Sequence, residues 1–329
     1  MKVAIIGAGI SGLATAQALT KRGIHVKVFE KSRGVGGRLA TKRLDWGHID
    51  IGAQYFTARS ERFQKQVAKW QQDKVVACWQ FTPHAMKNGD LIIRPDTSTR
   101  YVSVPDMASI AHALAHNIEI CFNTRISALE FGANGWSLVT ADGERISDCY
   151  DWVVVSLPAE QSGTLLAGTA IEHQIPEDIH QPCWALALAT RGNVPREIQG
   201  IFGDDVVSWV SRLSARPQRQ MSQSYDDLWM LHFSSEWSKI NDKNTPVDIT
   251  KTGLKWLSAM LEQHTPGPLE LVQDYKHYWR YARVRTEKVK PSVIADKPSG
   301  VAAIGAWSAG GRVEGAYLSA LEFVDHFFE

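Results

Sequence analysis

Residues 2–30, KVAIIGAGISGLATAQALTKRGIHVKVFE, decide how the chain begins to fold. Lys2 to Ile6 is a short apolar run, which predicts a strand buried on both faces. The run leads into the pattern Gly7-x-Gly9-x-x-Gly12, and the helical pattern that follows stops before Gly23. A second run, His25 to Glu30, completes a β-α-β unit, whose crossover connection requires parallel pairing of the two strands.

The glycine spacing in this unit predicts a dinucleotide-binding site. Gly7 permits a tight turn, Gly9 lets a pyrophosphate approach the backbone, and Gly12 lets the helix pack closely on the strand. The positive end of the helix then presents backbone N–H groups to the phosphates. Glu30, at the end of the second strand, can accept hydrogen bonds from both ribose hydroxyls. The alternative is a glycine-rich turn in an unrelated α/β protein.

A second glycine-rich loop distinguishes FAD from NAD. Gly36-Gly37-Arg38 follows directly after Glu30, and Thr41 and Arg43 lie just beyond it. Such a loop suits a cofactor with a long pyrophosphate and ribityl chain, because arginine forms strong charge-assisted hydrogen bonds with phosphate. The alternative for these arginines is a solvated basic loop. The two loops together predict FAD.

The composition excludes several other classes of protein. The net charge is +1, the charges are mixed along the chain, and the apolar fraction is 44%. Nothing in this balance favours a nucleic-acid surface or a membrane patch, and no apolar run is long enough to span a bilayer. The four cysteines have no metal-ligand spacing and suit a reducing cytoplasm, so we expect a cytoplasmic protein without a metal. His112 and His116 are four residues apart on an expected helix, and a surface or core position explains them best.

The rest of the chain divides into a second nucleotide-binding part and a middle part of different character. We expect helices at 60–77, 105–115 and 312–328, short strands within 78–103, and strands at 118–126, 136–140, 151–157 and 301–304. Residues 182–280 are rich in Trp, His and β-branched residues and suggest a separate antiparallel sheet.

Three stretches resemble the bacterial renalases, which are relatives of the flavin monoamine oxidases. They are Glu30-Lys31-Ser32-Arg33-Gly34-x-Gly36-Gly37-Arg38, Asp50-x-Gly52-Ala53-Gln54-Tyr55-Phe56 and Gly310-Gly311-Arg312-Val313-Glu314-Gly315-Ala316. The glycine motifs are common to many flavoproteins, whereas the Gln-Tyr-Phe and Arg-Val-Glu-Gly-Ala stretches are more specific. The resemblance runs from the start of the chain to the C-terminal helix.

The resemblance implies an α/β fold: a doubly wound Rossmann-like FAD-binding domain with an inserted α+β substrate domain built on an antiparallel sheet. We assign residues 1–58, 100–160 and 285–329 to the FAD-binding domain, and 59–99 and 161–284 to the substrate domain. The positive N-terminus of the C-terminal helix, placed against the flavin, would stabilise negative charge on the ring. Ala306 stands where many flavoproteins of this class have an Asp that binds the ribityl chain, which leaves that contact in doubt.

The resemblance and the motifs together give the expected site residues. The cofactor-binding residues are Gly7, Gly9, Ile10, Ser11, Gly12, Glu30, Lys31, Gly36, Gly37, Arg38, Arg43, Gly52, Ala53, Gln54, Tyr55, Ile126, Gly305, Arg312, Val313, Glu314, Gly315 and Ala316. The candidates for the substrate pocket are Gln54, Tyr55, Trp184, His232, Trp279, Tyr281, Arg283 and Trp307. Tyr55 has an alternative place in the core. The C-terminal segment, where amine oxidases attach their flavin, contains no Cys, so non-covalent FAD is expected.

The activity that the resemblance implies is oxidation of 2- or 6-dihydronicotinamide dinucleotides to NAD(P)+, with oxygen reduced to hydrogen peroxide. Hydride transfer to a flavin needs correct geometry and no protein base. The expected partners are therefore the small dinucleotide and oxygen. The alternatives are a flavin amine oxidase, a non-catalytic flavin-binding redox sensor or scaffold, and a plain NAD-dependent dehydrogenase, which Gly36-Gly37-Arg38 disfavours.

Overall fold

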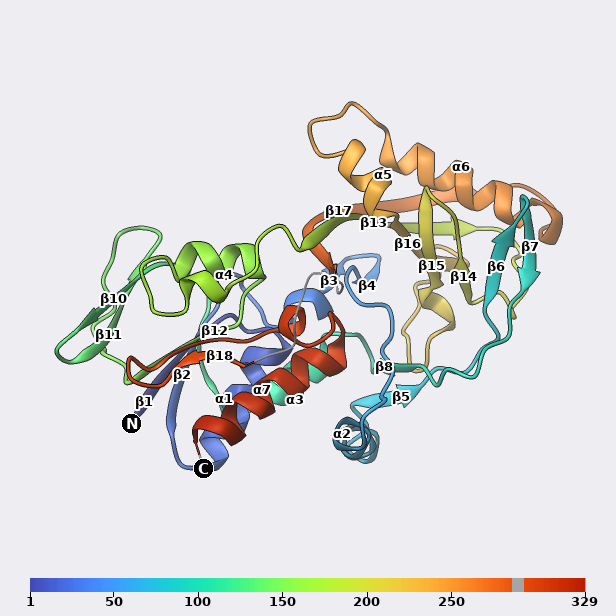
Figure 1. Cartoon of the computed structure of the whole chain (residues 1–329). Coiled ribbons are helices and arrows are strands. Elements are labelled where there is room, and N and C mark those ends of the chain that lie inside the picture. Colours follow the sequence, from blue (N-terminus) through green and yellow to red (C-terminus); the bar gives the residue numbers. More distant parts are fainter. Residues whose placement is uncertain (286–292, 329) are drawn as a thin grey trace.

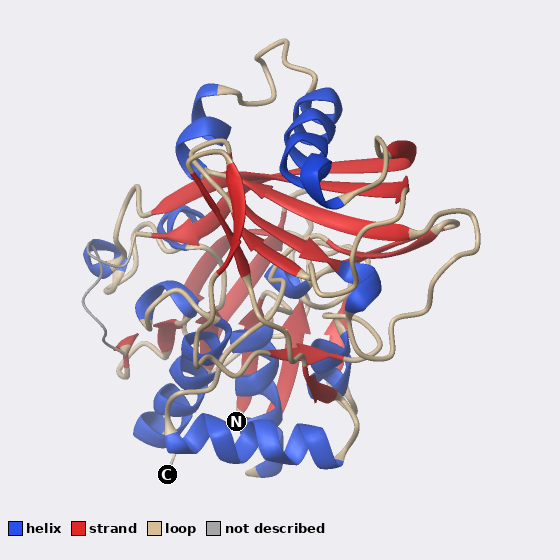
Figure 2. Ribbon diagram, turned by 90° about the vertical axis from the view of Figure 1, so that its right-hand side faces the viewer, coloured by secondary structure: helices blue, strands red, loops and turns tan. Residues whose placement is uncertain are grey.

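Two large sheets organise the molecule. A computed structural model describes residues 1–285 and 293–328. One sheet and its helices lie beside the two chain ends, and the second sheet lies beyond them under its own helices (Figure 1). Seen from the side, the second sheet is stacked above the first part of the molecule (Figure 2).

The six-stranded sheet begins with the β-α-β unit. Its order is β18-β19-β12-β1-β2-β9, parallel except for the antiparallel pair β18–β19. Its strands are β1 (Lys2–Ile6), β2 (His25–Phe29), β9 (Glu119–Cys121), β12 (Trp152–Val155), β18 (Ile294–Asp296) and β19 (Val301–Ala303). Consecutive residues of β1 point into different cores: Val3 and Ile5 into one, Ala4 and Ile6 into the other. Both faces are thus covered, as a parallel sheet requires.

Helices cover one face of this sheet and a mixed layer covers the other. The first face carries α1 (Ile10–Lys21), α3 (Ser109–Ala115) and α7 (Val313–Phe327). The second carries the hairpin β10 (Ile126–Gly132) and β11 (Gly135–Thr140) together with α4 (Ala159–Leu165). The hairpin turns at residues 133–134, and β11 begins at Gly135, whose φ is +94°.

The seven-stranded sheet has the order β17-β13-β16-β15-β14-β6-β7 and is antiparallel except for the pair β14–β6. Its strands are β6 (His84–Lys87), β7 (Asp90–Ile93), β13 (His180–Arg191), β14 (Gly200–Phe202), β15 (Val207–Arg212), β16 (Asp227–Phe233) and β17 (Glu270–Val284). The helices α5 (Ser235–Ile240) and α6 (Ile249–Leu261) cover one face. The short ribbon β3 (Thr41–Leu44) and β4 (Gly47–Asp50) meets the other.

Strand β13 shows how the two faces of this sheet differ. Leu186 and Leu188 pack into the core under α5 and α6, whereas Ala185, Ala187 and Ala189 face Ile49 and Ile51 at the end of the ribbon. All three alanines are completely buried. Small side chains on this face let the ribbon approach the sheet closely.

The remaining elements are short or lie outside the two large sheets. They are α2 (Glu61–Gln72), the pair β5 (Val76–Cys78) and β8 (Tyr101–Ser103), and the 3-10 turns at Gly37–Leu39, Glu172–Gln174, Leu213–Ala215, Glu262–His264 and Ala306–Ser308. Phe63 and Trp70 of α2 pack against Tyr317 of α7. The segment 61–72, which we assigned to the substrate domain, therefore shares a core with the C-terminal helix, and the exact domain division stays a prediction.

The expected fold class is confirmed: a doubly wound Rossmann-like sheet accompanied by an antiparallel sheet. Several bounds differ. The expected helices 60–77 and 105–115 are shorter, and the expected strand 118–126 is two separate strands, β9 and the start of β10. The antiparallel sheet also takes in β6 and β7, which lie far upstream of residues 182–280. Among the described helices, none is long and apolar enough to cross a membrane.

Candidate cofactor and substrate site

The first glycine loop has the geometry that its spacing predicted. Gly7 has a φ of +106°, which favours glycine, and a Cβ on Gly12 would lie only 2.1 Å from the Gly7 carbonyl oxygen. A Cβ on Gly9 would meet no described atom within 4 Å, so this glycine faces open space. Helix α1 begins at Ile10, and its first turn, with Ser11 and Gly12, has N–H groups without partners inside the helix. The loop is therefore suited to bind an anion.

Glu30 lies beside this loop at the end of β2. Its side chain is buried, and its carboxylate accepts hydrogen bonds from the Ala8 and Ser32 backbone N–H groups, each at 2.8 Å. A carboxylate offers about four acceptor positions. Two therefore remain for a ligand such as a ribose. Lys31, the next residue, is exposed.

The second glycine loop touches the first. The Gly36 N–H donates to the Ala8 carbonyl at 2.9 Å, and a Cβ on Gly37 would lie 3.4 Å from Cα of Gly9. Gly36 and Gly37 have φ values of +124° and +54°. Motifs separated in the sequence thus form one continuous glycine surface, which fits the pyrophosphate of a dinucleotide.

Arg38 connects this surface to the seven-stranded sheet. Its carbonyl accepts a hydrogen bond from the Ala53 N–H at 2.9 Å, and a Cβ on Gly52 would lie 1.9 Å from the same oxygen. Its guanidinium donates to the Ala282 carbonyl of β17 at 3.3 Å. Burial lowers the pKa of Arg38, and the nearby Glu160 carboxylate partly offsets this. Arg43 lies apart: it is exposed and directed toward Asp106 and His112.

The C-terminal motif is built around α7. The Gly311 N–H donates to the Ala306 carbonyl at 2.7 Å, and a Cβ on Gly315 would lie 1.8 Å from the Ala309 carbonyl oxygen. This close contact explains why a glycine stands in the first turns of the helix. Arg312, which precedes α7, is exposed, whereas Gly305 and Ala316 are buried and Val313 is half-buried. Ile126 is buried at the start of β10.

Glu314 has a different role from the cofactor contact that we expected. Its carboxylate accepts hydrogen bonds from the Ser60 N–H and Ser60 hydroxyl, each at 2.7 Å, and from the Arg59 N–H at 3.2 Å. Ser60 is the N-cap of α2. The contacts of this acid therefore join α7 to α2, which nothing in the local sequence indicated.

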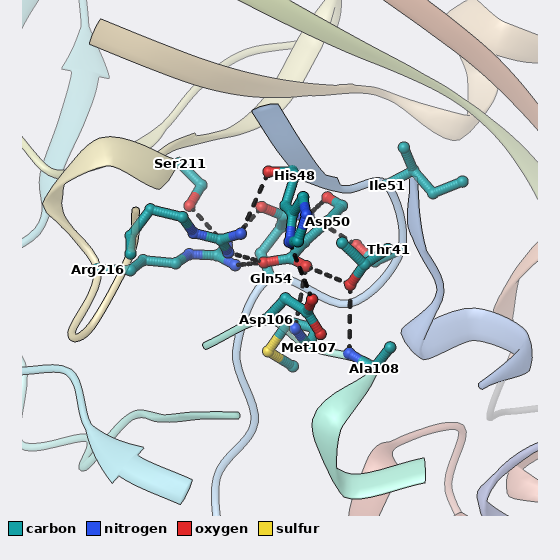
Figure 3. A network of polar contacts seen from close by, with 12 residues as sticks. Thr41, His48, Asp50, Ile51, Gln54, Asp106, Met107, Ala108, Ser211 and Arg216 are labelled. Carbon is teal, nitrogen blue, oxygen red and sulfur yellow. Dashed lines mark hydrogen bonds and ion pairs between the residues drawn. The ribbon is translucent and has the colours of Figure 1, made fainter. Parts of the chain in front are cut away.

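A buried polar network holds the segment 50–54 (Figure 3). The Asp50 carboxylate accepts hydrogen bonds from the Thr41 hydroxyl at 2.6 Å, the Met107 N–H at 3.0 Å and the Arg216 guanidinium at 2.6 Å. Arg219 donates to the same carboxylate. Burial would raise the pKa of Asp50, but the charges of Arg219 and Arg216 hold it below its usual range. Burial lowers the pKa of Arg216 to about 9, so this side chain is still protonated at neutral pH.

Gln54 belongs to this network. Its side-chain NH₂ donates to the Asp50 and Gly52 carbonyls at 2.6 and 2.9 Å, and its side-chain oxygen accepts from Arg216 at 2.6 Å. The side chain is buried. Figure 3 shows it among these partners. Both ends of its amide therefore bind other residues, and the expected contact of Gln54 with a substrate or cofactor stays a prediction.

Two side chains of the seven-stranded sheet bind the next carbonyl in this segment. His232 of β16 and Trp279 of β17 both donate to the Ile51 carbonyl, at 3.3 and 2.9 Å. Burial, with a contribution from the Arg283 charge, lowers the pKa of His232 to about 3. The imidazole is therefore neutral at physiological pH. Its Nε2 carries the proton, because a carbonyl only accepts.

Ser208 forms hydrogen bonds with both Arg283 and His232. Its guanidinium donates to the Ser208 hydroxyl at 2.8 Å, and that hydroxyl donates to the His232 carbonyl at 3.0 Å. Tyr281, also of β17, packs edge-on against His180 at a centroid distance of 5.9 Å. The end of β17 thus brings three of the expected pocket residues, Trp279, Tyr281 and Arg283, into one region with His232.

Tyr55 contributes an aromatic cluster beside this region. Its ring lies 5.4 Å from that of Trp209, and the Arg100 guanidinium lies 5.3 Å from its centre. Trp209 is opposite His232 in the pairing of β15 with β16. Tyr55 is half-buried, so it is neither fully in the core nor on the open surface. We refer to Tyr55, Trp209, His232, Trp279 and Arg283 as the aromatic wall.

Two expected pocket residues lie elsewhere. The Trp184 indole donates to the Asn241 carbonyl at 2.6 Å and packs on Tyr278, on the face covered by α5 and α6. Trp307 is buried in the core of the six-stranded sheet and donates to the Leu157 carbonyl at 2.9 Å. Each indole is bound within a core away from the aromatic wall, and the assignment of both residues to the substrate pocket stays a prediction.

The sequence reasoning missed Trp209, Ser208, Arg216 and Arg219, and it used Asp50 only as part of a motif. Ser208 and Trp209 stand in an apolar run, Val-Val-Ser-Trp-Val, that a pairing argument could have placed opposite His232. The two arginines lie in a polar loop without any local signal. Within 1–285 and 293–328, no cluster of three or more His, Cys, Asp or Glu side chains is placed to hold a metal ion.

Comparisons with known proteins agree with this architecture. Residues 5–70 match the family model described as an NAD(P)-binding Rossmann-like domain. A 4,4'-diapophytoene desaturase of Staphylococcus aureus is 44% identical over 52 residues, which is 16% of this chain and 10% of the desaturase. The chain thus matches about a tenth of that relative's length.

Solved structures match over the whole chain. An oxidoreductase from Methanosarcina mazei has a TM-score of 0.72 at 14% identity and covers 99% of this chain and 100% of its own. Putrescine oxidase bound to putrescine has a TM-score of 0.72 at 13% identity, covering 99% of both chains. Reduced UDP-galactopyranose mutase has a TM-score of 0.77 at 12% identity, covering 99% and 95%. These matches show that the chain shares the fold of these proteins.

Proposed function

We propose that the chain is an FAD-dependent oxidase of the renalase type, which oxidises 2- or 6-dihydronicotinamide dinucleotides to NAD(P)+ and reduces oxygen to hydrogen peroxide. The names of its structural neighbours, which include an oxidoreductase and putrescine oxidase, accord with an oxidoreductase. The motif resemblance to renalases narrows this to the dihydronicotinamide reaction.

The described residues fit FAD. The joined glycine surface of Gly9 and Gly37 would receive the pyrophosphate, and Glu30 has acceptor positions left for the ribose. No Cys lies in the C-terminal segment that includes Gly305 to Ala316, so the cofactor is proposed to be dissociable. When bound, FAD would supply acceptance of the substrate hydride and two-electron reduction of oxygen to hydrogen peroxide, with one proton from the hydride and a second from solvent.

The aromatic wall favours hydride transfer over a reaction that needs a protein base. His232 is neutral, its pKa is about 3, and its Nε2–H is bound to the Ile51 carbonyl, which makes it a poor base. Within the described part of the chain, no carboxylate forms a hydrogen bond or ion pair with His232 or Arg283. A site with aromatic surfaces and no effective base suits a planar hydride donor, because that reaction needs only positioning.

The test is anaerobic mixing of the yellow holoenzyme with each substrate class while the flavin absorbance is followed. We expect rapid bleaching by 2- or 6-dihydronicotinamide dinucleotides and little by benzylamine or putrescine. NADH, which carries its hydride at ring position 4, should act as a competitive inhibitor in an oxygen-electrode assay. Efficient turnover of NADH, or bleaching by amines alone, would contradict the proposal.

A further inference from the structure

Arg283 is held in place, and the described residues use only a small part of its hydrogen-bonding capacity. Its one described hydrogen bond runs from Nη2 to the Ser208 hydroxyl at 2.8 Å. A guanidinium has five N–H donors in a planar fork. Ser208 is itself fixed by its bond to the His232 carbonyl at 3.0 Å. One edge of the Arg283 side chain is therefore anchored, and the side chain is exposed to a ligand.

Among the described residues Arg283 has no ion pair, in contrast to Arg212, Arg216, Arg219 and Arg285. Arg212 is paired with Asp227, Arg216 and Arg219 are paired with Asp50, and Arg285 is paired with Asp178. Within 1–285 and 293–328, no ion pair includes Arg283. An exposed guanidinium without an acid is a ready receptor for an anion.

Of the five residues of the aromatic wall, Arg283 alone carries a positive charge. His232, its neighbour, is neutral, so it supplies no charge. Trp279 and Trp209 supply ring surface. A ligand with a planar ring and an anionic group would match this set, whereas an ammonium group would be repelled by Arg283.

We infer that Arg283 recognises the 5′-phosphate on the nicotinamide side of the substrate and so determines specificity for nucleotides. This inference rests on the proposed function, which supplies the planar ring. A fork of parallel N–H groups can bind two phosphate oxygens at once, and lysine cannot reproduce that geometry. Arg283 would thus select against both amines and phosphate-free nicotinamide ribosides.

The experiment compares two reduced substrates that differ only in the phosphate: 2- or 6-dihydronicotinamide mononucleotide and the corresponding riboside. Anaerobic flavin reduction is measured as a function of substrate concentration. We expect the holoenzyme to prefer the mononucleotide, and Arg283→Gln to reduce that preference by about tenfold to a hundredfold. Arg283→Lys should retain part of it. An equal preference in the unchanged enzyme and Arg283→Gln would overturn the inference.

Arg280→Gln is the matched control. Arg280 is an exposed arginine of the same strand, and its charge acts on Tyr278, which packs on Trp184 beneath the helices. This variant loses the same charge but should keep the preference for the mononucleotide. If Arg280→Gln lost the preference as much as Arg283→Gln, general charge would explain the effect and the inference would fail.

A binding measurement separates this inference from the proposed function. Titration calorimetry of the FAD-loaded protein with ADP-ribose needs no turnover. We expect binding by the unchanged protein and an affinity at least about tenfold lower for Arg283→Gln. Absence of binding, or equal binding by both proteins, would overturn the inference. If neither reduced substrate bleached the flavin but ADP-ribose binding still depended on Arg283, the proposed reaction would fail while phosphate recognition would stand.

Discussion

Two buried acids, Glu30 beside the glycine loops and Asp50 beside the seven-stranded sheet, are surrounded in opposite ways. Glu30 accepts two backbone N–H groups and lies next to Ala8, in the loop where Gly9 faces open space. Asp50 is bound by two guanidiniums, a hydroxyl and a backbone N–H. Burial alone does not distinguish them. Unused acceptor capacity does: Glu30 can still bind a ligand, whereas Asp50 holds parts of the fold together.

The largest effect is expected from Asp50→Ala. Its loss would leave Arg216 and Arg219 buried without their shared carboxylate. Breaking a buried ion pair by removing one partner costs about 3–5 kcal/mol, so the free energy of unfolding should fall by that amount. Urea denaturation measures it, with Glu30→Gln as the control that should change stability far less. A decrease in the free energy of unfolding of less than about 1 kcal/mol would contradict the proposed difference between Asp50 and Glu30.

The pH dependence of stability provides a second test of Asp50. The folded-state pKa of Asp50 is lowered, so the folded protein binds fewer protons than the unfolded chain and stability rises with pH in that window. The contribution is complete above the unfolded pKa of about 3.9 and is lost as the pH falls through the folded pKa. The stability gap between the unchanged protein and Asp50→Asn should therefore narrow below about pH 4. A difference in stability between the two proteins that grew as the pH fell would contradict the predicted direction of this pH dependence.

Glu30→Gln should affect the ligand and not the fold. Hydrogen bonds to a charged group contribute about 1.5–3 kcal/mol each, so weakening them should lower FAD affinity by about tenfold or more. Fluorescence quenching of FAD by the cofactor-free protein measures the affinity. Unchanged affinity would mean that Glu30 only secures the Ala8 and Ser32 backbone.

The smallest effects concern two tryptophans on opposite sides of the seven-stranded sheet. Trp279→Phe removes the donor to the Ile51 carbonyl and should slow flavin reduction, because the segment 50–54 loses one of its supports. Trp184→Phe loses a bond to Asn241 under the helices, at a cost of about 1 kcal/mol, and should leave flavin reduction unchanged. Equal effects of the two substitutions on the rate of flavin reduction would contradict the proposed difference between the two faces of the seven-stranded sheet.

The sequence predicted the parts of the molecule that depend on local spacing. Gly7, Gly9 and Gly12 and the acid at the end of β2 lie within one β-α-β unit, so their mutual positions follow from the geometry of that unit. Asp50 and Arg216 are 166 residues apart, and no local pattern brings them together. Their contact arises only when the ribbon β3–β4 docks on the large sheet.

The sequence does not indicate on which face of its strand Trp184 lies. A strand places successive side chains on opposite faces, so a shift of one position exchanges the faces. The stretch Trp184-Ala-Leu-Ala-Leu-Ala is apolar throughout, because both faces of β13 are covered. Without alternation between polar and apolar residues, the sequence could not indicate which face meets the ribbon. Trp307 lies in a 3-10 turn, Ala306–Ser308, to which the alternation of strand faces does not apply, so its contact with Leu157 had no local signal either.

Cys183 stands opposite Trp279 in the pairing of β13 with β17, close to where hydrogen peroxide would be released in the proposed reaction. Peroxide attacks thiolates much faster than thiols. Burial raises the pKa of Cys183 to about 11, and its Sγ–H is directed to the Phe233 carbonyl at 3.3 Å. The Cys183 sulfur is thus kept in its unreactive form. In the proposed oxidase, this would protect Cys183 from oxidation by the hydrogen peroxide that the enzyme produces.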